Sequence, residues 1–140
     1  MKRIIVFFSL LLVFSVVSGY SKNQTDKSSV IVMNANNDDA SAVKAYYFHA
    51  TRRCATCQAV EAVTKEALKE YYGDQVSFQS INREEDSKNP LIEKYKISGQ
   101  TLLIIKGDKV INLTNEAFLN ARIKPDKFKA KLKSTIDSIK

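Results

Sequence analysis

The two cysteines of this chain, Cys54 and Cys57, stand three residues apart at the junction between a strand-like run and a helical pattern. Residues 43–49 are β-branched and aromatic, whereas residues 54–72 carry apolar side chains at helical spacing. Cysteines three apart on the first turn of a helix share one face and can close a small disulfide. The chain is therefore predicted to pass from a strand into a helix that begins with a thiol pair.

Alternating strand and helix signals continue after this helix. Gly73 and Asp74 end it, and residues 76–81 read as a second strand. Asn89 and Pro90 then open a short helix, with proline at its favoured first position. The order strand, helix, strand, helix predicts an α/β fold.

The last third of the chain adds two strands and a helix. Residues 101–106 and 109–113 form a predicted antiparallel hairpin around Gly107-Asp108. Residues 114–123 are expected to add a helical turn. The helix from Pro125 onward has an apolar stripe made by Phe128, Leu132, Ile136 and Ile139. We predict a four-stranded mixed sheet flanked by helices on both faces.

The N-terminus has the features of a secretory signal. Lys2 and Arg3 precede an apolar run from Ile4 to Val17, which is shorter than the roughly 20 residues that span a bilayer. We predict cleavage after Gly19, a polar linker at 20–42 and one domain at 43–140. The protein is then periplasmic or otherwise extracytoplasmic, with membrane contact only if the signal is uncleaved.

Charge and motifs narrow the classes of function. The formal net charge is +7, but basic residues are mixed with acidic ones, without the basic blocks of a nucleic-acid groove. No glycine-rich phosphate loop, serine–histidine–carboxylate set or pair of catalytic carboxylates appears. Nucleic-acid binding, nucleotide use and hydrolysis therefore have no support.

From Val43 onward the chain resembles the thioredoxin superfamily. The resemblance rests on Cys54-Ala-Thr-Cys57 and on the segment from Tyr95 to Asp108. Residues 49–57 are also similar to a bacterial subgroup named nitrophenyl compound nitroreductase subunit ArsF. The resemblance implies a thioredoxin-like fold and a thiol–disulfide oxidoreductase. Its partners would be protein thiols, protein disulfides or a redox partner protein, with no cofactor beyond its own thiols.

The departures from the thioredoxin pattern are specific. Gln100, before Thr101, stands where the family has a cis-proline, and it is expected to be trans because a non-proline cis bond costs about 2.5 to 4 kcal/mol. The family holds a partner's backbone at this loop, so Gln100 and Thr101 are the candidate substrate-loop residues. Arg53 replaces the tryptophan that usually precedes the first cysteine. Phe48 replaces the buried carboxylate that thioredoxins place beneath the site, six residues before that cysteine, and is expected in its place.

The remaining site residues follow from the thiol chemistry. Cys54 is the candidate nucleophile and Cys57 the candidate resolving thiol. The helix start, together with the charges of Arg52 and Arg53, favours the thiolate of Cys54. His49, the one histidine, ends the first strand and is a candidate for tuning the thiolate.

Two alternatives stay open. The pair could form a structural disulfide, although so small a loop stabilises less than a long one. It could also serve a non-catalytic binding module, either a carrier of copper(I) or the subunit of a redox complex. Two sulfurs and one imidazole fall short of four zinc ligands, so no resident metal is predicted. The dipeptide Ala55-Thr56 is neither Gly-Pro nor Pro-His, and it assigns no redox direction.

Overall fold

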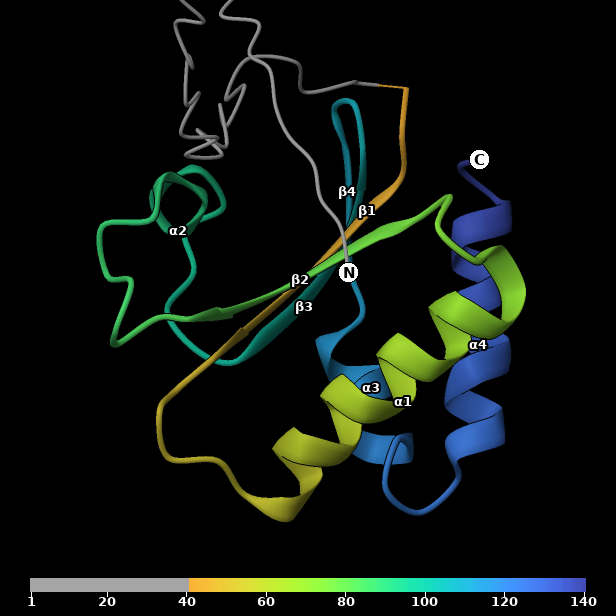
Figure 1. Cartoon of the computed structure of the whole chain (residues 1–140), viewed down its shortest axis with the longest axis horizontal. Coiled ribbons are helices and arrows are strands. Elements are labelled where there is room, and N and C mark those ends of the chain that lie inside the picture. The colour runs from red at the N-terminus through yellow and green to blue at the C-terminus, as the bar shows by residue number, and fades with distance from the viewer. Residues whose placement is uncertain (1–40) are drawn as a thin grey trace, which may run out of the picture. The chain divides into compact units, whose positions relative to one another are not determined.

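The computed structural model describes residues 41–140, and the predicted signal peptide and nearly all of the predicted linker lie outside this range. Eight elements follow one another in the order predicted (Figure 1): β1 Lys44–His49, α1 Ala55–Tyr72, β2 Ser77–Asn82, α2 Pro90–Lys94, β3 Thr101–Lys106, β4 Lys109–Asn112, α3 Thr114–Asn120 and α4 Pro125–Asp137. None of the helices in the described range combines the length and the apolar composition needed to cross a bilayer.

The strands form one mixed sheet in the order β2-β1-β3-β4. Strand β1 pairs parallel with β2 and antiparallel with β3, and β3 pairs antiparallel with β4. The hairpin turn places Gly107 at a φ of 55°, a conformation that glycine adopts without strain. The predicted four-stranded mixed sheet is confirmed, and its central strand β1 leads directly into the loop that carries the cysteines.

Alternation along the strands produces two apolar layers. Ala45 and Tyr47 of β1 pack on the face covered by α1, α3 and α4, whereas Phe48 packs on the face covered by α2. In β3 the same alternation sends Leu102 to the first face and Leu103 to the second. Helices cover both faces of the sheet, as predicted, and Figure 1 shows α2 apart from the other three helices.

Helix α3 is longer than the single turn expected for residues 114–123, since it spans seven residues. Two hydrogen bonds hold its start: Thr114 accepts one from the backbone of Leu102 at 2.9 Å, across the fold, and its own N–H donates to the nearby Asn112 at 2.9 Å. Ala117, on the inner side of the helix, is fully buried. Packing therefore stabilises a helix for which the short sequence pattern gives only a weak signal.

Helices α1 and α4 run side by side in the same direction. Lys129 bonds to Glu66 at 2.7 Å and to Glu70 at 3.1 Å, and further along Tyr72 donates to Asp137 at 2.7 Å. The predicted stripe of α4 faces this interface, with Phe128, Leu132 and Ile136 fully buried. The second half of α1 is thereby anchored to α4.

Candidate functional site

The two cysteines occupy the start of α1, with opposite exposure. Cys54 is the N-cap residue, in an extended conformation, and its sulfur accepts a hydrogen bond from the backbone N–H of Cys57 at 3.3 Å. Cys54 is exposed, whereas Cys57 is only 1% exposed. One sulfur can therefore meet a partner while the other stays covered, one helical turn away.

The environment of Cys54 favours its thiolate. A side-chain hydrogen bond from Cys57 is the largest cause that lowers the pKa of Cys54 from its ordinary value of 9.0. Backbone N–H groups at the helix start, those of Cys57 and Thr56, add to this effect. The backbone N–H groups at the start of α1 thus favour the thiolate of Cys54, as expected for a helix N-terminus.

The two arginines beside Cys54 behave differently. Arg52 is exposed, whereas Arg53 folds back over the helix and donates from Nη2 to the carbonyl oxygen of Cys57 at 3.3 Å. Its guanidinium forms an ion pair with Glu61 and lies 5.7 Å from the centre of the Tyr47 ring. Neither arginine is among the causes that lower the pKa of Cys54, and the tuning of the thiolate by their charges stays a prediction.

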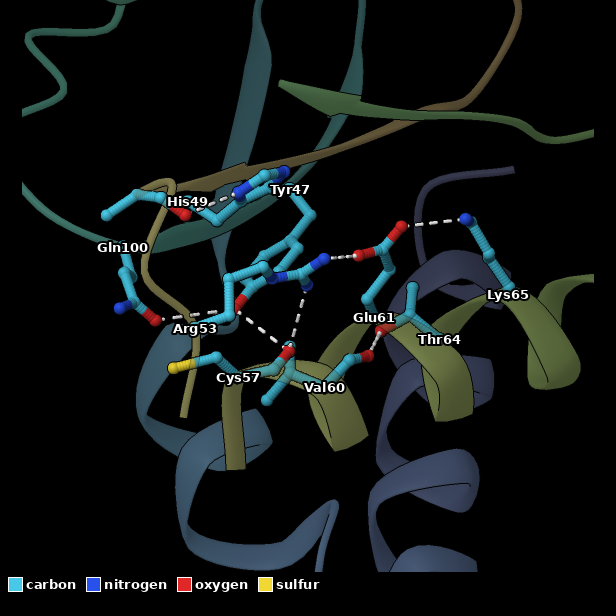
Figure 2. A network of polar contacts seen from close by, with 10 residues as sticks. Tyr47, His49, Arg53, Cys57, Val60, Glu61, Thr64, Lys65 and Gln100 are labelled. Atoms are coloured by element: carbon cyan, nitrogen blue, oxygen red, sulfur yellow. Dashed lines mark hydrogen bonds and ion pairs between the residues drawn. The ribbon is translucent and has the colours of Figure 1, made fainter. Parts of the chain in front are cut away.

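Glu61 links Arg53 to a second cation. Its carboxylate bonds to Lys65 at 2.7 Å and pairs with Arg53, while its side chain is 14% exposed. Burial opposes ionisation, but these two hydrogen-bonded cations outweigh it and lower the pKa of Glu61 below 4.5. Figure 2 shows the resulting chain of contacts from Lys65 through Glu61 and Arg53 to the backbone of Cys57.

The side chain beneath the buried cysteine is Tyr47. Its hydroxyl lies 3.2 Å from the carbonyl oxygen of Cys57, and burial is the main cause that raises the pKa of Tyr47 to about 12. Phe48, which we expected in this place, points to the opposite face of the sheet and packs with Ile81. The expectation was wrong by one residue, because successive side chains of a strand point to opposite faces.

The predicted substrate loop reaches this network through Gln100. The Oε1 atom of Gln100 lies 3.4 Å from the Tyr47 hydroxyl, as the dashed line in Figure 2 shows. Thr101 instead donates from its hydroxyl to the carbonyl of Gly99 at 3.1 Å. No cis peptide bond occurs in residues 41–140, so Gln100 is trans, as expected.

His49 contacts the edge of the same network. Its Nδ1 atom lies 2.9 Å from the carbonyl oxygen of Ala50, and its ring centre lies 5.8 Å from that of Tyr47. Its role in tuning the thiolate stays a prediction. Across the described residues, no three side chains of the types His, Cys, Asp and Glu gather where they could hold a metal ion.

Sequence reasoning missed two members of the site. Tyr47 was assigned only to the strand within residues 43–49, and Glu61 was not assigned a role. A signal for Glu61 does exist, since it stands four residues after Cys57 and therefore on the same side of the helix. For Tyr47 the signal is the alternation of side chains along the strand, which assigns Tyr47 to one face of the sheet once the face of a neighbouring residue is known.

No protein-family model matches this chain, and no curated protein sequence does. Among solved structures, it is similar to thioredoxin O2 from Arabidopsis thaliana in the oxidised state, at 22% identity and a TM-score of 0.47, over 72% of this chain and 77% of that one. It is also similar to the chloroplastic thioredoxin z, at 22% identity and a TM-score of 0.41, over 51% of this chain and 64% of that one.

A malarial protein is similar as well, at 20% identity and a TM-score of 0.40, over 49% of this chain and 74% of that one. At such identities these similarities give no evidence for the reaction of this protein, which has to be argued from the side chains of its own site.

Proposed function

We propose that this protein is a thiol–disulfide oxidoreductase whose redox groups are Cys54 and Cys57. One observation carries the proposal, namely that Cys54 is exposed with a lowered pKa while Cys57 is buried one turn away and hydrogen-bonded to it. Nucleophilic attack needs an accessible thiolate, and its resolution needs a second thiol within reach. The pair meets both requirements.

The reaction in the reducing direction has two exchanges. The Cys54 thiolate attacks one sulfur of a partner disulfide, so that a bond forms to that sulfur and the other partner sulfur leaves as a thiolate, which takes up a proton. Cys57 then loses its proton and attacks the Cys54 sulfur. This closes the Cys54–Cys57 disulfide and releases the second partner thiolate, so that two electrons pass to the partner. The oxidising direction is the reverse.

The partner of this reaction is a protein thiol, a protein disulfide or a redox partner protein. The sulfurs themselves carry the electrons, so that the exchange uses no further cofactor. Exposure of Cys54 at the N-cap supports a partner that docks over the start of α1. The similarity of residues 49–57 to the ArsF subgroup stays a prediction and assigns no substrate.

We place this chemistry outside the cytoplasm. The support is the N-terminal pattern, with Lys2 and Arg3 before the apolar run from Ile4 to Val17 and small residues at the predicted cleavage point. The mass of the protein recovered from the producing cells tests it. Cleavage after Gly19 supports export with release, and an intact N-terminus in the membrane fraction supports an anchored form.

A trapping experiment tests the function. The purified protein is incubated with insulin as the disulfide probe, and covalent adducts are read by mass under non-reducing conditions. Cys57→Ala should accumulate a mixed disulfide at Cys54, the wild type should turn over in the presence of dithiothreitol, and Cys54→Ala should form no adduct. Absence of the adduct in Cys57→Ala would overturn the proposal.

The reduction potential separates the enzyme from the binding module. A reversible two-electron couple between about −270 mV and about −120 mV, measured against glutathione, would support the oxidoreductase and assign its direction. A reduced pair that takes up one copper(I) per chain and no longer cycles would support the binding module instead. Loss of copper(I) on changing either cysteine would identify the thiols as its ligands.

A further inference from the structure

Arg53 brings a positive charge to the backbone of the buried cysteine. Its Nη2 atom lies 3.3 Å from the carbonyl oxygen of Cys57, and its guanidinium lies against the buried Tyr47 ring. The Nε atom of Arg53 is buried without a hydrogen-bond partner in the described structure. A guanidinium in such a place is partly desolvated, and its field is screened less than that of a surface charge such as Arg52.

Glu61 determines how much of this charge the thiols experience. It is the carboxylate that pairs with Arg53, and it stands on the helical turn after Cys57. The other groups facing the guanidinium are the hydroxyl of Tyr47, which stays neutral, and the carbonyl of Cys57, while Lys65 adds its cation from the exposed side of Glu61. Removing Glu61 would leave Arg53 without its carboxylate partner at the Cys57 carbonyl.

We infer that Glu61 is a positioning residue that sets the reduction potential of the Cys54–Cys57 pair by neutralising Arg53 at the Cys57 carbonyl. The inference rests on the proposed function. A positive charge stabilises the thiolate of the reduced form and leaves the neutral disulfide unaffected, so an uncompensated Arg53 makes the pair more oxidising. Glu61 opposes that effect and keeps the pair more reducing.

The signs of two substitutions test this role. The equilibrium of the dithiol with oxidised glutathione, which yields the Cys54–Cys57 disulfide and reduced glutathione, is measured at pH 8. Glu61→Gln should lower the equilibrium constant for oxidation about threefold to tenfold, which corresponds to a rise of about 15 to 30 mV in potential. Arg53→Gln should change it in the opposite direction, because Glu61 then faces the thiols with Lys65 alone.

A double variant and a matched control separate charge from structure. Glu61→Gln combined with Arg53→Gln should return close to the wild-type potential, and Glu61→Asp, which keeps the charge, should remain near it. Glu66→Gln removes the same charge from a position further along α1, where the partner is Lys129, and should leave the potential unchanged.

The inference would be overturned if Glu61→Gln and Arg53→Gln shifted the potential in the same direction. It would also be overturned if the double variant did not return close to the wild-type potential. Variants that all cycle at the wild-type potential would overturn it as well, while leaving the proposed function intact. A wild-type pair that fails to cycle at all would overturn both.

Discussion

The hydroxyl oxygen of Tyr47 lies 3.2 Å from the carbonyl oxygen of Cys57, joining the central strand to the first turn of the thiol helix. A second acceptor, Gln100 Oε1, lies 3.4 Å away, yet a phenol has one proton and donates to one acceptor at a time. Arg53 also donates to the Cys57 carbonyl. The Tyr47 hydroxyl can therefore donate either to the Cys57 carbonyl or to Gln100, and this one buried side chain lies between strand β1, helix α1 and the loop before β3.

Tyr47→Phe should lower the free energy of unfolding by about 0.5 to 1.5 kcal/mol, the usual net contribution of a buried hydrogen bond. The loss should be constant between pH 6 and pH 9, because the pKa of Tyr47 near 12 keeps the hydroxyl protonated throughout. Urea unfolding at several pH values measures it. Tyr71→Phe, at a partly buried tyrosine of α1, is the control, and an equal loss there would remove the specific role of Tyr47.

Alkylation of Cys54 by iodoacetamide should follow a titration with a midpoint below 9.0, because the pKa of Cys54 is lowered by its hydrogen bond from Cys57. Cys57→Ala removes that donor and should move the midpoint upward, whereas Cys57→Ser keeps a donor and should move it less. Reaction rates followed by mass spectrometry across the pH range give the midpoint. Identical profiles for the alanine and serine variants would show that the side-chain hydrogen bond is not the cause.

Leu132→Ala should destabilise the domain by about 2 to 5 kcal/mol, because the side chain is fully buried in the apolar core on which α4 packs and its removal leaves a cavity. Leu119→Ala makes the same chemical change at a residue that is 66% exposed, and should stay within about 0.5 kcal/mol. Denaturant unfolding of both variants gives the comparison. Similar losses would mean that Leu119 is covered in solution.

Glu61 should contribute an acid-sensitive part of the stability. Its pKa in the folded state is below the ordinary 4.5, so the stabilisation is present above pH 4.5 and is lost as the pH falls through the folded value. For this partly buried pair we expect about 0.5 to 1 kcal/mol, the upper part of the range for exposed pairs. Glu61→Gln should flatten this part of the curve of unfolding free energy against pH, and an unchanged acid limb in the variant would contradict the assignment.

Much of the fold could be predicted because its elements have strong local signals. The continuous apolar run within residues 101–106 yields strand β3 at the predicted bounds, and the stripe that includes Phe128 and Leu132 is the buried face of α4. The proline that opens α2 is equally local, as Asn89 caps the helix by accepting from Leu91 at 3.0 Å. Helix α3 was underestimated, because its stabilising partners Leu102 and Asn112 belong to the preceding hairpin.

The candidate site divides in the same way. Cys54 and Cys57 are three residues apart, at the point where the apolar pattern changes from that of a strand to that of a helix. The sequence alone therefore determined the thiol pair and its place between a strand and the start of a helix. These are interactions over a few residues, for which chain connectivity sets the distances. Cys54 was expected to be the nucleophile because it stands at the helix start, and the buried position of Cys57 agrees with this expectation.

Only the tertiary structure decided what surrounds the pair. It places Tyr47 rather than Phe48 beneath Cys57, turns Arg53 onto Glu61, and brings Gln100 to Tyr47 across 53 positions of sequence. Such contacts depend on the face to which each strand residue points and on the register of β1 with β3, both of which are set by burying apolar area over the whole sheet. Local spacing along the chain sets the positions of the reacting sulfurs, whereas the packing of distant elements sets the charges and hydrogen bonds that act on them.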